Sequence, residues 1–396
     1  MLAQAMIAGR GYAALETMET FLRAKKLITE STEDAQKFSI LYGIWACYYV
    51  SGEVAMQQVT AAEFLAEAER YGDTAALCLA HRALGTTYVT MGEFVSGRGH
   101  LERARALYDP EHHPRFRFQY GQDIGATALC YLSWALWHLG YVDQASDIAD
   151  EAVKCAEAIS HPHTLVYTLC HARGMMDVFR RRTQDTRSYA AVVLSLCSEH
   201  GFPFWAAGGE ILHGWAGTRE GEPDAGIATL RSGLDAWRET GARLWMPMFL
   251  ALEAEVHAKG GRNGAALHAI EQALATSNET GERWALAEVL RIKAGLLLTA
   301  GRAKADEVEN LLTKSLEIAR RQQALCWELR ASCDLARLWR SQGRDKDALE
   351  LIRSIYGQFT EGFETPDLQE AKALMEALTV YPVTKRARRK KTETRA

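Results

Sequence analysis

The stretch "GFPFWAAGGEILHGWAGTREGEPDAG" (201–226) contains seven glycines and two tryptophans in a chain that is otherwise rich in alanine and leucine. Such a stretch could be a glycine-rich loop that binds a phosphate, or helices joined by tight turns. Recurrence of the same pattern at a fixed spacing would decide for the helices, because a fixed period is the signature of a repeat protein.

Glycines recur along this chain in two interleaved series, each with a spacing of 40 residues. The two series lie midway between one another and consist of Gly221, Gly261 and Gly301, and of Gly201, Gly241 and Gly281. The intervening stretches, such as "AALHAIEQALATS" (265–277), place apolar residues at helical spacing. Each unit is therefore predicted to be a helix, a turn, a second helix and a second turn.

Small residues occur at fixed offsets from the turns inside the units. The first series is extended less regularly by Gly52, Gly92, Gly140, Arg181 and Gly343. Together with Gly221, Gly261 and Gly301 they make eight turn positions. Seven residues before the eight turn positions stand Trp45, Gly85, Ser133, Gly174, Gly214, Ala254, Ala294 and Ala336, of which only the first is large. Five residues after six of them stand Gly97, Ala145, Thr186, Gly226, Ala266 and Ala348. The seventh unit carries about two extra residues in "GRAKADEVENLL" (301–312). These offsets predict a close crossing of the paired helices, while Gly208, Gly209 and Gly217 have no role in this scheme.

The small-Gly-small pattern resembles the tetratricopeptide repeat, most closely in "LGTTYVTMGEFVSGRGHLERARAL" (84–107). We therefore expect an all-α, right-handed superhelical solenoid of about eight to nine antiparallel helix pairs, with HEAT-type repeats as the alternative because their period is nearer to 40 residues. The solenoid is predicted over 1–380. Its first repeat is incomplete, with "MLAQAMIAG" (1–9) as a short first helix, and such an uncapped edge favours self-association. Residues 381–396, with "KRARRKKTETRA" (385–396), are predicted to be a basic, disordered tail without specific nucleic-acid binding.

Composition excludes several classes of protein. The net charge is −4, 48% of the residues are hydrophobic, and no apolar run is long enough to span a membrane. The start of the chain lacks the layout of a secretory signal, so a cytoplasmic location is expected. Eight cysteines without a C-x-x-C pair predict reduced, buried thiols.

Three phrases resemble a known family: "YGQDIGATALCYLSWALWHLGYVDQA" (120–145), "HGFPFWAAGGEILHGWA" (200–216) and "IYGQFTEGFETPDLQEAKALMEAL" (355–378). They look like the C-terminal tetratricopeptide-repeat region of bacterial multidomain proteins that join a class III adenylate or guanylate cyclase to a P-loop ATPase. The resemblance covers nearly the whole chain, but only that family's repeat region. It implies cyclic-nucleotide signalling as the context, whereas this chain has no G-x-x-x-x-G-K-[ST] phosphate loop.

No catalytic, cofactor-binding or metal site is predicted. Nucleophile-elbow, H-E-x-x-H and G-x-G-x-x-G patterns are absent. The densest histidine group, His161, His163 and His171 beside Cys170, is scattered over a turn and a helix. His112 and His113 lie in an insertion that is either a contact loop or a plain connector.

A helical solenoid commonly binds its partner on the concave face, which the first helices line. By analogy with tetratricopeptide repeats, the candidate groove residues are Tyr42, Tyr49, Trp134, Trp137, His138, His171, Trp215, Arg291, Arg330, Arg337 and Arg340. An aromatic stretch leading into a basic one would suit an acidic peptide with apolar anchors. The alternative interpretation is that the aromatic residues are core and the arginines form a solvated face.

Two classes of function remain open at this point. The first is a non-catalytic scaffold or sensor module that binds a protein or peptide partner, such as a cyclase or ATPase module. The second is a separated C-terminal fragment of a longer adenylate or guanylate cyclase. A third possibility is the helical-repeat arm of an ATPase-type transcription regulator.

Overall fold

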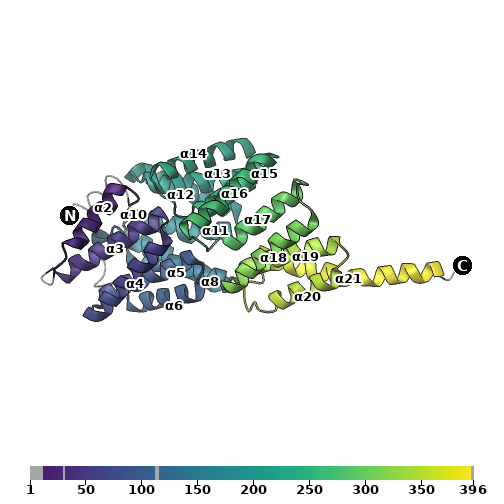
Figure 1. Cartoon of the computed structure of the whole chain (residues 1–396), viewed down its shortest axis with the longest axis horizontal. Coiled ribbons are helices and arrows are strands. Elements are labelled where there is room, and N and C mark those ends of the chain that lie inside the picture. Colours follow the sequence, from purple (N-terminus) through teal and green to yellow (C-terminus); the bar gives the residue numbers. More distant parts are fainter. Residues whose placement is uncertain (1–11, 30–31, 112–115, 394–396) are drawn as a thin grey trace.

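The computed structural model describes residues 12–29, 32–111 and 116–393, and every regular element within these ranges is helical. The helices follow one another as antiparallel neighbours along a superhelical path (Figure 1). The predicted all-helical fold is therefore confirmed. The short helix expected at 1–9 lies outside the described residues, as do His112 and His113.

Eight helix pairs lie within the described residues, in agreement with the predicted number. In chain order they are α3 (Asp34–Ser51) with α4 (Val54–Tyr71); α5 (Thr74–Met91) with α6 (Phe94–Leu107); α8 (Ile124–His138) with α9 (Val142–Ile159); the run of α10 (Pro162–Thr168), π-helical η1 (Leu169–Met175) and α11 (Met176–Phe179) with α12 (Thr183–His200); α13 (Pro203–Arg219) with α14 (Pro223–Glu239); α15 (Met246–Lys259) with α16 (Asn263–Thr280); α17 (Leu286–Thr299) with α18 (Ala305–Arg321); and α19 (Leu325–Ser341) with α20 (Asp345–Tyr356). Outside the pairs lie α2 (Leu15–Lys26), α7 (Phe116–Gln119) and α21 (Pro366–Glu393).

The turn positions of both glycine series have the left-handed backbone that ends a helix. The dihedral angle φ is 107° at Gly221 and 72° at Gly201, a region that glycine adopts at little cost. Arg181, which replaces glycine in one unit, has the same conformation with φ of 59°. The extra residues of the seventh unit are also present, because α18 begins four residues after Gly301 whereas α14 begins two after Gly221.

The paired helices cross at the predicted small residues. A Cβ atom added to Gly214 of α13 would lie 2.5 Å from the carbonyl oxygen of Gly226 in α14, so neither position can carry a side chain without separating the helices. Gly208 and Gly209, which have no role in the repeat scheme, lie against the ring of Trp237 and against Leu194, each 3.2 Å from the position of an added Cβ. The packing of α13 against its neighbours therefore accounts for most of the glycines in the opening stretch.

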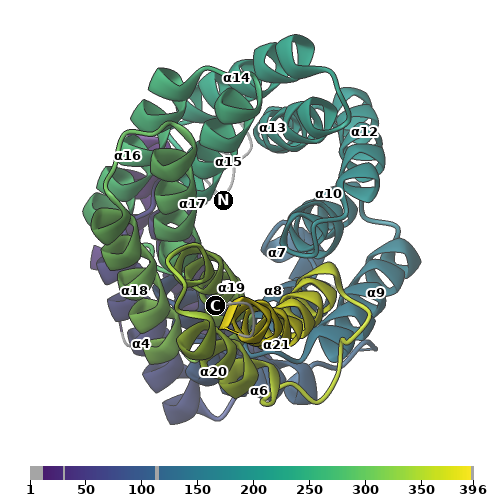
Figure 2. The same cartoon turned by 90° about the vertical axis from the view of Figure 1, so that its right-hand side faces the viewer.

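The solenoid winds far enough for its second superhelical turn to pack on its first. The carbonyl oxygen of Val50 accepts hydrogen bonds from the backbone N–H groups of Arg243 (3.0 Å) and Leu244 (3.2 Å). The carbonyl oxygen of Thr90 in the same way accepts the N–H of Arg283 (2.9 Å). These partners are almost five repeats apart, so about five repeats complete one turn. Figure 2 shows the resulting ring, with α13, α15 and α17 on the inside and α14, α16 and α18 on the outside.

Tryptophan side chains fill the seam between the two turns. The ring of Trp134 lies 5.2 Å from the rings of both Trp245 and Trp284, and the rings of Trp137 and Trp327 are 4.7 Å apart, measured between centroids. All five are buried. Large aromatic surfaces contribute most to burial of apolar area, so this seam holds the superhelix closed.

A buried glutamate at the seam has no cationic partner in the described part of the chain. Glu282 is 2% exposed, and its carboxylate accepts hydrogen bonds from the backbone N–H of Trp245 (3.1 Å) and the indole N–H of Trp284 (2.5 Å). Burial raises its pKa from 4.5 to about 7, although these two hydrogen bonds act in the opposite direction.

We expect the carboxyl of Glu282 to contribute a loss of stability as the pH rises from about 4.5 to 7, while the buried histidines His138 and His171, whose pKa is lowered, act in the opposite direction in wild type and variants alike. Below pH 4.5 the carboxyl is protonated in both the folded and the unfolded chain; above it, ionisation favours the unfolded chain. The loss is about 3 kcal/mol from the size of the shift. Urea unfolding across this range measures each variant against wild type: the difference between Glu282→Gln and wild type should change by about 3 kcal/mol, and the difference between the exposed variant Glu279→Gln and wild type should stay constant. A constant difference between Glu282→Gln and wild type would contradict the assignment.

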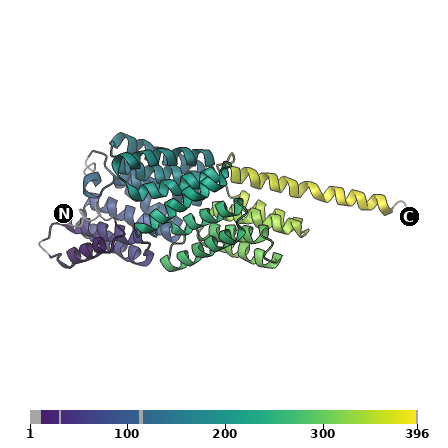
Figure 3. The same cartoon turned by 90° about the horizontal axis from the view of Figure 1, so that it is seen from above.

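The C-terminal helix α21 projects away from the body of the solenoid (Figure 3). It continues to Glu393, so the structure has helix over part of the segment in which the sequence predicts disorder. The division of the chain at residue 381 stays a prediction.

Seven of the eight cysteines are buried and none forms a disulfide in the described ranges, in line with the thiols expected. None of the helices described combines the length and apolar character that crossing a membrane requires.

Candidate functional site

The structure places the aromatic part of the predicted groove inside the protein. The buried members of that set are Tyr42, Tyr49, Trp134, Trp137, His138, His171 and Trp215, all at most 6% exposed. Most of them are covered because the second superhelical turn lies on the first helices of the first turn. These side chains therefore do not form an open aromatic groove, and the alternative interpretation as core applies to them, except that Trp215 also lines the hollow described below.

The two histidines of this set are structural. The Nδ1 atoms of His138 and His171 pair with the backbone oxygens of Trp134 (2.7 Å) and Tyr167 (2.8 Å), one helical turn earlier. Burial lowers the pKa of both rings far enough to keep them neutral at pH 7. No cluster of three metal-ligating side chains occurs among the described residues.

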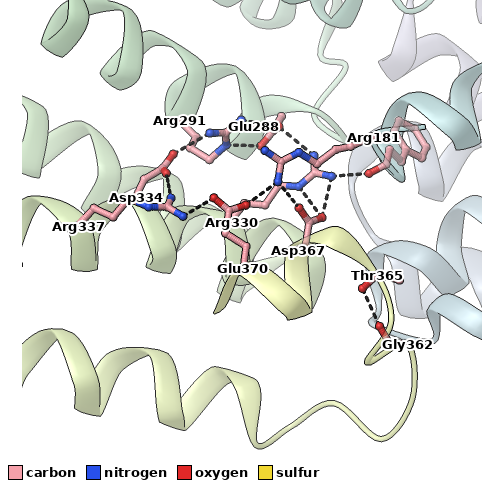
Figure 4. A network of polar contacts seen from close by, with 11 residues as sticks. Arg181, Glu288, Arg291, Arg330, Asp334, Arg337, Gly362, Thr365, Asp367 and Glu370 are labelled. Atoms are coloured by element: carbon pink, nitrogen blue, oxygen red, sulfur yellow. Dashed lines mark hydrogen bonds and ion pairs between the residues drawn. The ribbon is translucent and has the colours of Figure 1, made fainter. Parts of the chain in front are cut away.

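The arginine part of the predicted groove is an ion network between α17, α19 and α21 (Figure 4). Arg291 pairs with Glu288 and Asp334, both at 2.7 Å. Arg330 pairs with Glu288 at 3.1 Å and Asp367 at 2.8 Å. The remaining members of the network are Arg337, which contacts Asp334 and Glu370, and Arg181, which contacts Asp367 and Glu370. Arg340, also in the predicted set, is half-buried near the end of α19.

This network is electrically balanced, because four arginines meet four carboxylates. Burial alone would raise the pKa of Glu288, but the adjacent Arg291 and Arg330 outweigh it and lower the pKa from 4.5 to about 2. Arg330 also donates a hydrogen bond to the backbone oxygen of Phe179 and so connects the two superhelical turns. The expected basic surface is thus absent here, because these arginines already have carboxylate partners within the chain.

An open hollow of about 260 Å³ lies beside this network on the inner wall. Residues of the first helices α13, α15 and α17 line it, so it faces the concave side. Trp215 and Arg219 come from α13, Glu255 and Lys259 from α15, and Gly295 from α17. Of the predicted groove residues, only Trp215 and Arg291 contribute to this hollow.

Polar contacts order one side of the hollow. The indole N–H of Trp215 donates to Glu255 (3.0 Å), and the guanidinium of Arg219 lies 3.5 Å from the same carboxylate and 5.0 Å from the Trp215 ring centroid. Lys259 donates to the backbone oxygen of Arg219 (3.0 Å). Sequence reasoning missed Arg219, Glu255, Lys259 and Gly295. Their signal is the period itself, since 215, 255 and 295 are 40 residues apart, as are 219, 259 and 299.

The fold and its inner wall define the class of protein as an all-helical, tetratricopeptide-like solenoid. No protein-family model matches the chain. An uncharacterized protein of Rhizobium meliloti (strain 1021) is 25% identical over 232 residues, which are 58% of this chain and 22% of that protein. The chain therefore matches less than a quarter of the length of this relative.

Two solved structures share the fold over nearly their whole length. One is a Rap protein complexed with competence and sporulation factor, with a TM-score of 0.61, 12% identity and coverage of 95% of this chain and 96% of the other. The second is the Rap conjugation gene regulator of the plasmid pLS20 in complex with the Phr* peptide, with a TM-score of 0.51, 11% identity and coverage of 95% and 94%. At these identities the likeness concerns the fold alone.

Proposed function

We propose that the chain is a non-catalytic helical-repeat module that binds a peptide or protein partner in the hollow between α13, α15 and α17. The observation that carries this proposal is an open concavity whose wall combines a tryptophan, three cations and an exposed glycine. Concave faces of solenoids are extended binding surfaces. The two Rap structures of the same fold were solved with competence and sporulation factor and with the Phr* peptide, which supports a peptide ligand.

We further propose that this module works within a bacterial cyclase and ATPase signalling system, in the cytoplasm. The resemblance of the three quoted phrases supports this context, and the Rhizobium meliloti relative is a much longer protein, as expected for a multidomain signalling protein. The alternatives remain a fragment of a longer cyclase and the arm of an ATPase-type transcription regulator. Purified chain should neither cyclise nor hydrolyse ATP; turnover above background would contradict the proposal.

Filling the hollow should weaken partner binding at least about tenfold without unfolding the protein. Gly295 is exposed on α17, and an added Cβ would meet no other atom within 4 Å, so Gly295→Phe projects a ring into open space. Replacing a glycine inside a helix also favours the helix, by up to about 1 kcal/mol. Peptides selected on wild type from a displayed random library should bind Gly295→Phe at least about tenfold more weakly, because buried contacts worth 1 to 3 kcal/mol are lost.

The matched control is Gly99→Phe. Gly99 is likewise exposed within a helix and free of neighbours within 4 Å, but it lies on α6, a second helix. Binding of the selected peptides should be unchanged by this substitution. Equal binding by wild type and both variants, with unchanged melting temperatures, would place the binding surface elsewhere.

A further inference from the structure

The positive charge of the hollow is not balanced within it. Glu255 is the carboxylate that lines it, against the cations of Arg219, Lys259 and Arg291. Arg291 is neutralised from outside the hollow by Glu288 and Asp334, both at 2.7 Å. Two cations therefore share one carboxylate at this side of the wall.

The carboxylate of Glu255 also accepts a hydrogen bond from a group other than the two cations. Glu255 accepts the indole N–H of Trp215 at 3.0 Å, and its ion pair with Arg219 is longer, at 3.5 Å. Lys259 is exposed, and no carboxylate is paired with it in the described part of the chain. The rim formed by Arg219 and Lys259 thus retains one unit of positive charge and donor groups for an incoming acceptor.

The opposite side of the hollow is aliphatic. Val256 of α15 and Ile292 and Leu296 of α17 line it, and the missing side chain at Gly295 leaves room beside them. The volume of about 260 Å³ is below the roughly 300 to 1,000 Å³ of pockets that enclose a whole small molecule. It fits one or two side chains of a longer ligand, whose backbone would continue along the inner wall.

From this arrangement we infer that the hollow binds an extended peptide segment in which an acidic side chain adjoins an aliphatic one. The carboxylate of the ligand meets Lys259 and Arg219, and the aliphatic side chain packs on Ile292 and Leu296. This inference rests on the proposed function and adds the chemistry of the ligand to it. Lys259 determines the preference for the acidic residue, while Gly295 provides the space.

The test uses three pools of fluorescein-labelled hexapeptides, which carry a fixed Leu-Glu, Leu-Gln or Leu-Lys pair and random residues elsewhere. Fluorescence anisotropy measures their affinity for the full chain. We expect the Leu-Glu pool to bind about tenfold more tightly than the Leu-Gln pool, as for a charge-assisted hydrogen bond, and this preference to shrink as salt rises.

Reversing the charge of Lys259 should reverse the order in which the protein prefers the Leu-Glu and Leu-Lys pools. Lys259→Glu should favour the Leu-Lys pool over the Leu-Glu pool, which a merely structural role of Lys259 would not produce. The matched control is Lys314→Glu on the second helix α18, where the lysine is also exposed and the preference should stay that of wild type.

Each other result overturns the inference in a recognisable way. Equal binding of the Leu-Glu and Leu-Gln pools, or identical behaviour of Lys259→Glu and Lys314→Glu, removes the charge preference. If Gly295→Phe still weakens binding of the pools at least about tenfold in that case, the proposed function stands and only the ligand chemistry is wrong. If Gly295→Phe leaves the binding of the pools intact, or no pool binds, the hollow is not the peptide site described.

Discussion

Gly214→Ala should lower the free energy of unfolding by about 3 kcal/mol, although alanine is the better helix former. The added Cβ would meet the amide nitrogen of Leu230 and lie 2.5 Å from the carbonyl oxygen of Gly226. Both are backbone atoms, which cannot move aside as a flexible side chain can. Overpacking of this kind typically costs about 1 to 3 kcal/mol, and separating two backbones falls at the upper end.

The same substitution elsewhere in α13 is the control. At Gly217 the nearest atoms to an added Cβ are 3.8 Å away, so Gly217→Ala should raise stability by up to about 1 kcal/mol through helix propensity. Urea unfolding of both variants, with circular dichroism at 222 nm as the signal, compares them directly. Equal midpoints for Gly214→Ala and Gly217→Ala would mean that α13 and α14 do not depend on a close crossing.

The crossing of Gly214 with Gly226 illustrates why the fold could be predicted from the sequence. The turn residue and the small residues before and after it recur at fixed offsets, because every helix pair solves the same local problem of ending a helix and crossing its neighbour. Each repeat therefore carries in its own sequence the residues that end its helices and let them cross. Even the stand-in Arg181 adopts the left-handed turn conformation, with φ of 59°.

The position of the groove could not be predicted in the same way. Trp134 and Trp137 occupy the positions that face the concave side, yet they are buried because Trp284 and Trp327 reach them from the next superhelical turn. Whether two superhelical turns touch depends on small rotations between neighbouring repeats that accumulate over about five repeats. The sequence of a single repeat does not determine the total rotation.

The candidate site depended on a different omission. Aromatic and basic side chains alone do not mark this site, because its wall also includes Glu255 and Gly295, which stand 40 and 80 residues after Trp215. Likewise, the arginines of α17 and α19 predicted a basic face only as long as Asp334, Asp367 and Glu370 were not placed opposite them. The hollow and its charge emerge only when first helices of neighbouring repeats are compared position by position.

Removing the shared carboxylate of the ion network should have the largest electrostatic effect. Glu288→Ala should lower the free energy of unfolding by about 3 to 5 kcal/mol, the cost of removing one partner from a buried ion pair, because Arg291 and Arg330 then share only Asp334 and Asp367. The Glu288 side chain is 4% exposed and that of Arg330 is 9% exposed, so water replaces little of the lost interaction. Because Arg330 also bonds to the backbone oxygen of Phe179, the loss should loosen the contact between the superhelical turns.

The control is Glu102→Ala, which breaks the pair with Arg98 on the outer surface of α6. Both side chains are about a third or more exposed, so the loss should stay below about 1 kcal/mol. Urea unfolding at pH 7 measures both variants, and protease sensitivity of the native state reports the loosening. A loss of less than 1 kcal/mol for Glu288→Ala would show that Asp334 and Asp367 alone satisfy the arginines.

The pH dependence separates this glutamate from the one at the seam. The pKa of Glu288 is lowered to about 2, so its stabilisation is fully present above pH 4.5 and is lost as the pH falls toward 2. The pKa of Glu282, six residues earlier, is raised to about 7, so its contribution is lost as the pH rises instead. Relative to wild type, Glu288→Gln should therefore weaken the loss of stability below pH 4.5, where Glu370 also contributes because its pKa is lowered, and leave the change between pH 4.5 and 7 as it is; Glu282→Gln should do the reverse. A single substitution that changed the pH dependence in both ranges would show that the two carboxyls titrate as one coupled unit.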